Sequence, residues 1–193
     1  EDKKGVLEVL DSDQLSLGPK YLQFEKDISV YTGAKYACAV SNGTCGLHLA
    51  VRALDLREGD EVITTPFSFV ASTNCLLYEK CKPVFVDIES LTFNINPERI
   101  EEKITQKTKA ILVVHVFGQP AEMGTILEIA KKHQLLVIED AAESFGSKYN
   151  GRHLGTIGDV GVYAFYPNKQ MTTGEGGMIV TNSSKIHDLC KSM

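Results

Sequence analysis

The sequence predicts an α/β fold of three layers, in which a mostly parallel sheet is flanked by helices on both faces. Short apolar runs alternate along the chain with segments of helical periodicity. The run 160–166 carries no charge, as expected of a strand that is buried on both faces. Polar residues directly follow several of the apolar runs, and sheets of this kind bind their ligands at that end of their strands.

Composition excludes several classes of protein. The 193 residues suffice for one sizeable domain, and 43% hydrophobic with 23% charged residues is ordinary for a globular protein. A net charge of −5 without any basic run argues against nucleic acid as a partner. No apolar run approaches the roughly 20 residues that span a membrane, and the chain does not open with a signal-peptide pattern. We therefore expect a cytoplasmic protein with no membrane partner.

The cysteines predict free thiols in a reducing compartment. Their number is odd and no two form a close pair, which argues against a disulfide framework. No Cys-x-x-Cys pair or His/Cys cluster indicates zinc, so no metal site is expected. The five residues are Cys38, Cys45, Cys75, Cys81 and Cys190.

The first half of the chain alternates between predicted helices and strands. Residues 21–31 mix apolar and charged side chains as a surface helix does, and Gly33 ends that helix. Residues 45–56 carry leucine, alanine and valine at helical spacing. A turn at 58–60 introduces a strand that Pro66 ends. The predicted helices are 3–10, 21–31, 45–56 and 70–79, and the predicted strands are 36–40, 61–64 and 82–87.

The second half continues this alternation. Pro97 suits the first turn of a helix that begins after Asn96. The aliphatic run within 110–116 is a strong strand signal, and Pro167 ends the strand 160–166. Three glycines within 174–177 allow an unusual backbone path before the last strand. The predicted strands are 110–116, 135–138, 160–166 and 178–181, and further helices are predicted at 123–132 and from 184 onward.

The turn Asn42-Gly43-Thr44 lies between a predicted strand and a predicted helix. Free backbone N–H groups and the positive end of the helix dipole make such a position suitable for a phosphate. A plain N-cap by Ser41 or Thr44 explains the same residues. The turn by itself leaves both interpretations open.

Two charged residues follow predicted strands. Asp140 comes after the strand 135–138, where a turn or helix-cap aspartate is the competing interpretation. Lys169 comes after the strand 160–166, where a solvated surface lysine is the competing interpretation. His115 also lies at a strand end and is a candidate for a supporting polar role, whereas His48 is expected to be an ordinary helix residue.

One ligand would use these parts together. It would be anionic for the turn at Asn42-Gly43-Thr44, flat for an aromatic such as Phe69, cationic at a ring nitrogen for Asp140, and open to a covalent link from Lys169. Pyridoxal phosphate has all four properties, and proteins hold it through a lysine Schiff base with an acid beside the ring nitrogen. Asp140 would keep that nitrogen protonated as an electron sink, and Lys169 would act as the base for proton transfer.

Six sequence blocks also follow one another along nearly the whole chain in a recognisable order. They are residues 41–44, 61–71, 82–88, 118–121, 139–142 and 165–169, preceded by the segment 15–19. Together they resemble successive blocks of the DegT/DnrJ/EryC1/StrS sugar aminotransferases. The order and extent of the blocks make this resemblance far more specific than any one motif.

The resemblance implies a fold-type I pyridoxal-phosphate enzyme. Members of that family move an amino group from an amino acid, usually glutamate, to a keto group of a nucleotide-linked sugar, for amino sugars of cell-envelope polysaccharides. They usually form homodimers. On the matching positions, the resemblance implies Lys169 as the Schiff-base lysine and Asp140 as the partner of the ring nitrogen. Phe69 would stack on the ring, and the phosphate would be bound by Gly43, Thr44 and Cys45.

Two residues depart from the pattern of many family members. Ala164 stands five positions before Lys169, where many members have a serine that binds the phosphate, so that contact is lost or replaced. Glu143 stands three positions after Asp140, where many members have glutamine, and it remains a candidate contact to the phenolic oxygen of the cofactor. Members with histidine in place of the lysine act as dehydratases, and Lys169 argues against that branch.

The family's chain is about twice as long and ends in a smaller domain. Residues 1–193 are therefore expected to be the pyridoxal-phosphate-binding large domain, without the C-terminal small domain. Two alternatives remain open: a non-catalytic regulatory protein on the same fold, and another fold-type I reaction such as a decarboxylase or cysteine desulfurase. A dinucleotide-binding Rossmann enzyme is disfavoured because no Gly-x-Gly-x-x-Gly follows the first strand.

Overall fold

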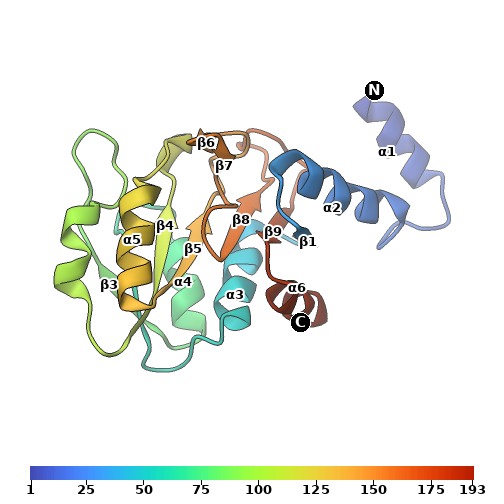
Figure 1. The fold of residues 1–193 in the computed structure, drawn as a ribbon. Coiled ribbons are helices and arrows are strands. Elements are labelled where there is room, and N and C mark those ends of the chain that lie inside the picture. The colour runs from blue at the N-terminus through green and yellow to red at the C-terminus, as the bar shows by residue number, and fades with distance from the viewer.

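A computed structural model describes all residues from Glu1 to Met193. A seven-stranded sheet with the order β1-β9-β8-β5-β4-β2-β3 forms its centre (Figure 1). The predicted α/β class with helices on both faces is confirmed. The strands are β1 (Tyr36–Val40), β2 (Glu61–Thr64), β3 (Lys82–Phe85), β4 (Thr108–Val114), β5 (Leu136–Asp140), β8 (Val160–Ala164) and β9 (Gly177–Thr181).

The sheet is parallel except around β9. Strands β3, β2, β4, β5 and β8 pair in parallel, whereas β9 pairs antiparallel with both β8 and β1. The carboxyl ends of the parallel strands therefore meet at one edge of the sheet. Val40 and Ala164 also reach this edge, because both pair with Gly177.

Helices cover the two faces of this sheet (Figure 1). Buried residues of α3, α4 and α6 form one cluster with one face, and buried residues of α5 form a second cluster with the other. A third cluster joins α2 to β8 and β9. The helices are α1 (Asp2–Leu10), α2 (Pro19–Thr32), α3 (Gly43–Ala53), α4 (Ala71–Tyr78), α5 (Met123–His133) and α6 (Ser184–Ser192).

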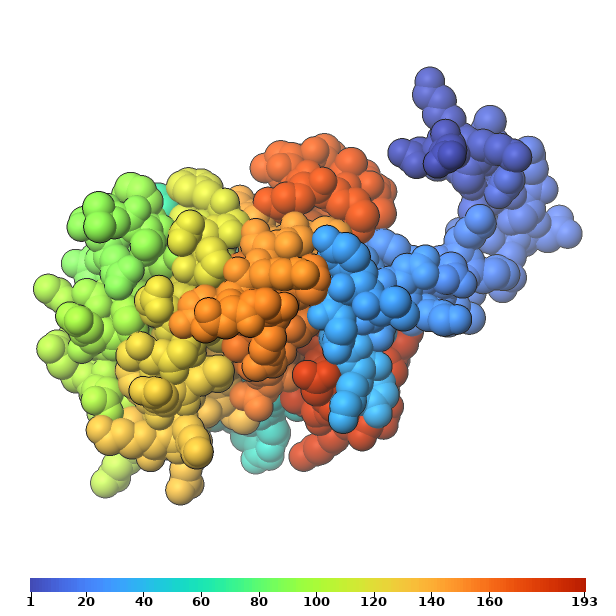
Figure 2. Space-filling view, turned by 45° about the horizontal axis from the view of Figure 1, so that its top comes forward, coloured from blue at the N-terminus to red at the C-terminus, as the bar shows by residue number.

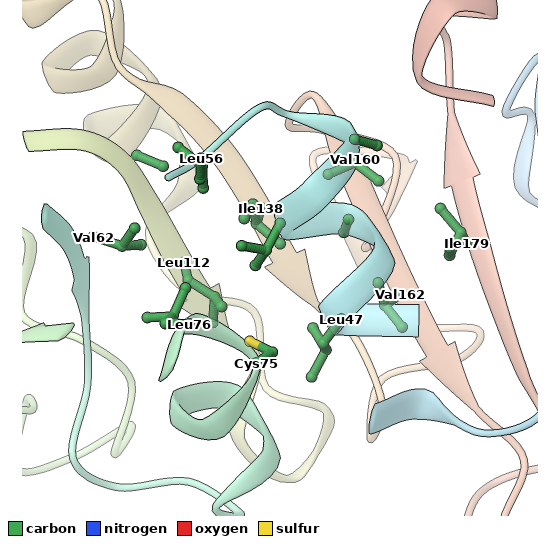
Figure 3. Packing of buried hydrophobic residues seen from close by; sticks show 14 of the residues in the cluster. Leu47, Leu56, Val62, Cys75, Leu76, Leu112, Ile138, Val160, Val162 and Ile179 are labelled. Atoms are coloured by element: carbon green, nitrogen blue, oxygen red, sulfur yellow. The ribbon is translucent and has the colours of Figure 1, made fainter. Parts of the chain in front are cut away.

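The central strands have apolar side chains on both faces, as the unbroken apolar runs predicted. In β4, Leu112 belongs to the cluster under α3 and α4, while Ile111 and Val113 belong to the cluster under α5. In β8, Val162 belongs to the cluster under α3 and α4, while Tyr163 belongs to the third cluster, which includes α2. Figure 3 shows Leu47 of α3 and Leu76 of α4 among the side chains of the first cluster.

Two local predictions were wrong or incomplete. The helix predicted after Asn96 is instead two short 3₁₀ turns, Pro97–Arg99 and Glu101–Lys103. Ile100 between them is completely buried, so the segment packs onto the core at this residue and does not continue as a regular helix. A small hairpin of β6 (Lys148–Tyr149) and β7 (Arg152–His153) was not predicted.

The N-terminal helix α1 extends away from the body of the molecule (Figures 1 and 2), and none of its residues is buried. Helix α2 is confirmed as a surface helix and ends at Gly33 in the left-handed region. Of its apolar residues, Ile28 is buried while Leu22 and Val30 are exposed. None of the helices combines the length and the apolar character that crossing a membrane requires.

Candidate active site

A cavity of about 730 Å³ opens at the edge where the parallel strands end. Its wall combines the start of α3, the segment before α4, the ends of β4, β5 and β8, and the loop after β8. The fold therefore brings together residues that are far apart in the sequence. The predicted site residues in this wall are Gly43, Thr44, Phe69, Asp140, Glu143 and Lys169.

Lys169 lies in the loop after β8 and is not a solvated surface lysine, since its side chain is only 15% exposed. Its Nζ lies 3.0 Å from Oε1 of Glu143. Oε2 of Glu143 accepts the backbone N–H of Phe117 at 3.3 Å. The backbone carbonyl of Glu143 accepts a hydrogen bond from the side-chain amide of Gln170. The lysine is thus held against the cavity by a carboxylate that is itself fixed.

Asp140 ends β5 and is 6% exposed. Its Oδ2 accepts the hydroxyl of Ser72 at 2.5 Å, and its Oδ1 accepts the N–H of Ala142 at 3.2 Å. Burial raises the pKa of Asp140, and the two hydrogen bonds oppose that rise only in part. A carboxyl in this state favours a cationic N–H partner, because such a partner would stabilise its anion.

The start of α3 offers unpaired N–H groups to the cavity. The side chain of Asn42 caps the helix by accepting the N–H of Cys45 at 2.8 Å, and the first backbone bond of the helix comes from Gly46. The N–H groups of Gly43 and Thr44 precede that bond, so they remain free for an anion. Cys45 is exposed and does not line the cavity.

Close packing of small residues positions this helix end. A Cβ atom at Gly177 would lie 2.6 Å from the backbone carbon of Asn42, and one at Gly43 would lie 2.8 Å from Cβ of Ala164. Ala164 therefore stands directly beside the free N–H groups but offers no hydroxyl. The hydroxyl of Thr44 lines the same wall and makes no hydrogen bond within the chain.

Aromatic side chains form the mouth of the cavity. Phe69 is 74% exposed and is therefore free to cover a flat ligand. Phe67 stacks on Phe93 with ring centroids 5.4 Å apart, and Phe117 meets its edge at 6.2 Å. Phe117 has a φ of 52°, which is uncommon for a residue with a side chain.

His115 lines the cavity but is fully buried, and its contacts indicate a structural role. Its Nδ1 accepts the N–H of Ala121 at 3.2 Å, so the ring hydrogen is on Nε2, which donates to Glu139 at 3.0 Å. Glu139 also accepts backbone N–H groups from the 155–158 turn. His48 pairs with Glu79 at 2.6 Å, away from the cavity, as expected of an ordinary helix residue.

Two residues at the site were not predicted. Ser72 touches Asp140 although 68 positions separate them, and nothing in its local sequence signals that contact. Glu139 directly precedes Asp140 in β5 and accepts hydrogen bonds from the 155–158 turn. Alternation along a strand could have shown that the two acids face opposite sides of the sheet.

The sequence matches the model of the DegT/DnrJ/EryC1/StrS aminotransferase family over residues 1–193. The chain belongs to this family. GDP-perosamine synthase of Escherichia coli O157:H7 is 47% identical over 98% of this chain and 52% of its own. The aminotransferase PseC of Helicobacter pylori, involved in pseudoaminic acid biosynthesis, superimposes with a TM-score of 0.94 at 37% identity, covering 99% of this chain and 52% of PseC.

A further solved structure is informative about the cofactor. NtdA of Bacillus subtilis, solved with bound PMP, has a TM-score of 0.84 at 38% identity, covering 90% of this chain and 39% of NtdA. This chain spans about half the length of the curated relatives it matches. The family and this structural neighbour imply pyridoxal phosphate as the cofactor.

The residues of this DegT/DnrJ/EryC1/StrS chain fit that cofactor. A carbonyl-reactive amine is present in Lys169, and a buried carboxyl without a cationic partner is present in Asp140. Free N–H groups at the start of α3 suit a phosphate, and Phe69 suits a ring. All of these groups line one cavity.

Proposed function

We propose that this chain forms the pyridoxal-phosphate-binding domain of a nucleotide-sugar aminotransferase. The amino group would come from an amino acid, with glutamate as the donor, and go to a keto group of the sugar. The observation that supports this most is the single cavity that Lys169, Asp140 and the free N–H groups of α3 share.

Each residue has a distinct task in this proposal. When bound, the cofactor supplies an electron sink for the carbanion at the carbon that carries the amino group. Lys169 would hold the cofactor as a Schiff base and, once released, would carry the proton between carbon atoms. Asp140 would keep the proton on the ring nitrogen, and Phe69 would cover the ring. Glu143 would orient Lys169 through the contact at 3.0 Å.

The phosphate would lie at the start of α3. Its oxygens would accept the N–H groups of Gly43 and Thr44, where the helix dipole favours negative charge. Because Ala164 supplies no hydroxyl, we propose that the hydroxyl of Thr44 replaces the contact that many relatives make from that position. The N–H of Cys45 is occupied by Asn42, so Cys45 would contribute less than the sequence resemblance implied.

The substrate class rests on the relatives. A GDP-perosamine synthase and an aminotransferase of pseudoaminic acid biosynthesis both act in sugar biosynthesis by their names, and each matches nearly all of this chain. We propose that residues 1–193 are the large domain and that a homodimer completes the site. The Phe67, Phe93 and Phe117 cluster at the cavity mouth supports a partner surface or substrate there, because its apolar area is exposed.

Lys169→Ala tests the proposal. The wild-type protein is expected to develop a visible absorption band with pyridoxal phosphate and to convert nucleotide keto-sugars to amino sugars with glutamate, detected by mass spectrometry. The variant is expected to lose both while its circular dichroism spectrum stays unchanged, and Lys35→Ala on the surface serves as the matched control. Retained transamination in Lys169→Ala would refute the assignment.

The alternatives predict different results. A regulatory protein would show no band and no amino transfer even in the wild type. Another fold-type I enzyme would show the band and react with an amino acid, yet form no amino sugar from any nucleotide keto-sugar tested.

A further inference from the structure

A chain of hydroxyl groups leads from the cavity wall to Asp140. Ser68 lines the cavity, and its Oγ lies 2.6 Å from Oγ of Ser72. Ser72 is completely buried in the first turn of α4, and its Oγ lies 2.5 Å from Oδ2 of Asp140. The same Oγ lies 3.2 Å from the carbonyl oxygen of Phe69. Ser72 thus has three oxygen neighbours.

A hydroxyl carries one hydrogen and two acceptor lone pairs, so Ser72 donates to only one of these oxygens at a time. When Asp140 is a carboxylate, the short contact at 2.5 Å attracts that hydrogen, and the hydroxyl of Ser68 donates to Ser72. When Asp140 carries a proton, Asp140 donates to Ser72, whose hydrogen then turns to the carbonyl of Phe69.

Neither arrangement leaves a buried group unpaired. The carbonyl of Phe69 accepts the backbone N–H of Ser72 at 3.2 Å in both cases, so it does not depend on the hydroxyl. No heavy atom has to move when the hydrogen turns. Ser72 therefore accommodates both charge states of a carboxyl whose burial would otherwise favour one of them.

We propose that Ser72 is a positioning residue that switches its hydrogen bond between Asp140 and Phe69, and thereby holds the proton on the cofactor's ring nitrogen. This inference rests on the proposed function. By donating to the carboxylate, Ser72 lowers the proton affinity of Asp140. A less basic Asp140 leaves the shared proton on the ring nitrogen, where it is needed for the electron sink.

No other side chain donates a hydrogen bond to Asp140. The titratable groups that interact electrostatically with it are His115, Lys169 and Cys75. The hydrogen of His115 goes to Glu139, and Lys169 lies against Glu143. The thiol of Cys75 lies 3.4 Å from the carbonyl of Ser72 rather than on the carboxylate. Apart from the N–H of Ala142, the hydroxyl of Ser72 is the only donor on Asp140.

Ser72→Ala and a cofactor labelled with ¹⁵N at the ring nitrogen provide the test. In the wild type, the ¹⁵N chemical shift is expected to report a protonated ring nitrogen throughout the pH range in which the protein is folded. In Ser72→Ala, the ratio of protonated to unprotonated ring nitrogen is expected to fall at least about tenfold at a given pH, because a hydrogen bond to a charged group is lost.

Two further variants keep the test decisive. Ser68→Ala removes only the second hydroxyl, at an exposed position, and is expected to shift the ¹⁵N signal in the same direction by less. Ser144→Ala is the matched control, because Ser144 is equally buried and donates to the carbonyl of Ala141 rather than to a carboxylate. An unchanged ¹⁵N signal in Ser72→Ala, or an equal change in Ser144→Ala, would overturn the proposal.

The cofactor-free protein supplies a second readout. The infrared C=O band of protonated Asp140, identified by its loss in Asp140→Asn, is expected to persist to higher pH in Ser72→Ala than in the wild type. In Ser72→Ala, the carboxylate form of Asp140 loses a stronger hydrogen bond than the protonated form loses. The variant therefore favours the protonated form. If the wild type binds no cofactor, the proposed function fails, and this band alone decides the role of Ser72: identical pH midpoints would overturn it.

Discussion

Glu139→Gln tests how the turn behind the cavity is stabilised. Glu139 is completely buried, and each of its oxygens accepts two hydrogen bonds. Oε1 accepts the N–H groups of Ile157 and Gly158, both at 2.6 Å, and Oε2 accepts that of Gly155 at 2.8 Å and Nε2 of His115 at 3.0 Å. All acceptor positions of the carboxylate are thus used.

An amide can satisfy only half of these donors. Its oxygen replaces one carboxylate oxygen, and its NH₂ group then faces two N–H groups that have lost their acceptor. A hydrogen bond to a charged group contributes about 1.5–3 kcal/mol, so two of them amount to about 3–6 kcal/mol. Removing a buried charge offsets part of this loss. We expect Glu139→Gln to lower the free energy of unfolding by about 3–5 kcal/mol.

Glu143→Gln is the matched control, since it makes the same chemical change four residues later. The side chain of Glu143 is 40% exposed, so water can replace its bonds, and we expect a loss below about 1 kcal/mol. Urea unfolding of the cofactor-free protein, followed by circular dichroism, measures both. A loss in Glu139→Gln no larger than that in Glu143→Gln would refute the reasoning.

Three other predictions concern single residues. Gly177→Ala is expected to lower the free energy of unfolding by about 1–3 kcal/mol and to weaken cofactor binding, since its Cβ would lie 2.6 Å from backbone of Asn42. Cys45 alone is exposed, so a thiol reagent is expected to label one cysteine in the native protein and all five after unfolding. Asp140→Asn is expected to stabilise the cofactor-free protein at neutral pH, with the difference disappearing below about pH 4, as urea unfolding at several pH values would measure.

Burial of Asp140 determines that Asp140→Asn raises the stability at neutral pH. Burial raises the pKa of Asp140 in the folded state above its value in the unfolded chain. Between these two pKa values the folded protein binds a proton that the unfolded chain has released, so stability falls as the pH rises. Equal stabilities of the variant and the wild type at neutral pH would contradict this account.

The predictions for Gly177 and Cys45 each have a control variant. Gly5→Ala has open space around its Cβ and is expected to leave binding unchanged, so an equal effect at both glycines would contradict the packing argument. Cys45→Ser is expected to abolish native labelling, because the remaining thiols are buried and burial raises the pKa of Cys81 to about 11. Rapid labelling of that variant would contradict the placement of Cys45.

The sequence predicted each strand of the large sheet because each is a separate apolar run, but several ends were wrong by two residues. Strand β8 ends at Ala164 and not just before Pro167, and β4 ends at Val114 and not at residue 116. Residues at the ends of parallel strands share one edge, so Asp140 and Lys169 were placed in one site without any contact being known. The antiparallel pairing of β1 with β9 was not predictable from these runs, because a run does not encode its partner. The small hairpin could have been found from Asn150-Gly151, whose φ angles of 48° and 80° suit a tight turn.

Contacts between side chains on different elements were beyond the sequence. Ser72 meets Asp140 only because α4 packs under the end of β5, and Glu143 meets Lys169 only because the loop after β8 turns back. The resemblance to the family predicted that a phosphate contact is lost or replaced at Ala164. Which hydroxyl stands nearby depends on the position of α3, and that position is set by packing against Gly177.

Two adjacent acids show how the fold separates structure from chemistry. A carboxylate can accept about four hydrogen bonds. Glu139 receives four from the protein and has no capacity left for a ligand, whereas Asp140 receives two. Asp140 is also the one that lines the cavity. A cationic N–H group of a ligand would supply what Asp140 lacks and would gain nothing from Glu139. The unequal hydrogen bonding of the two acids, rather than their charge, is therefore the reason to assign the ring nitrogen to Asp140.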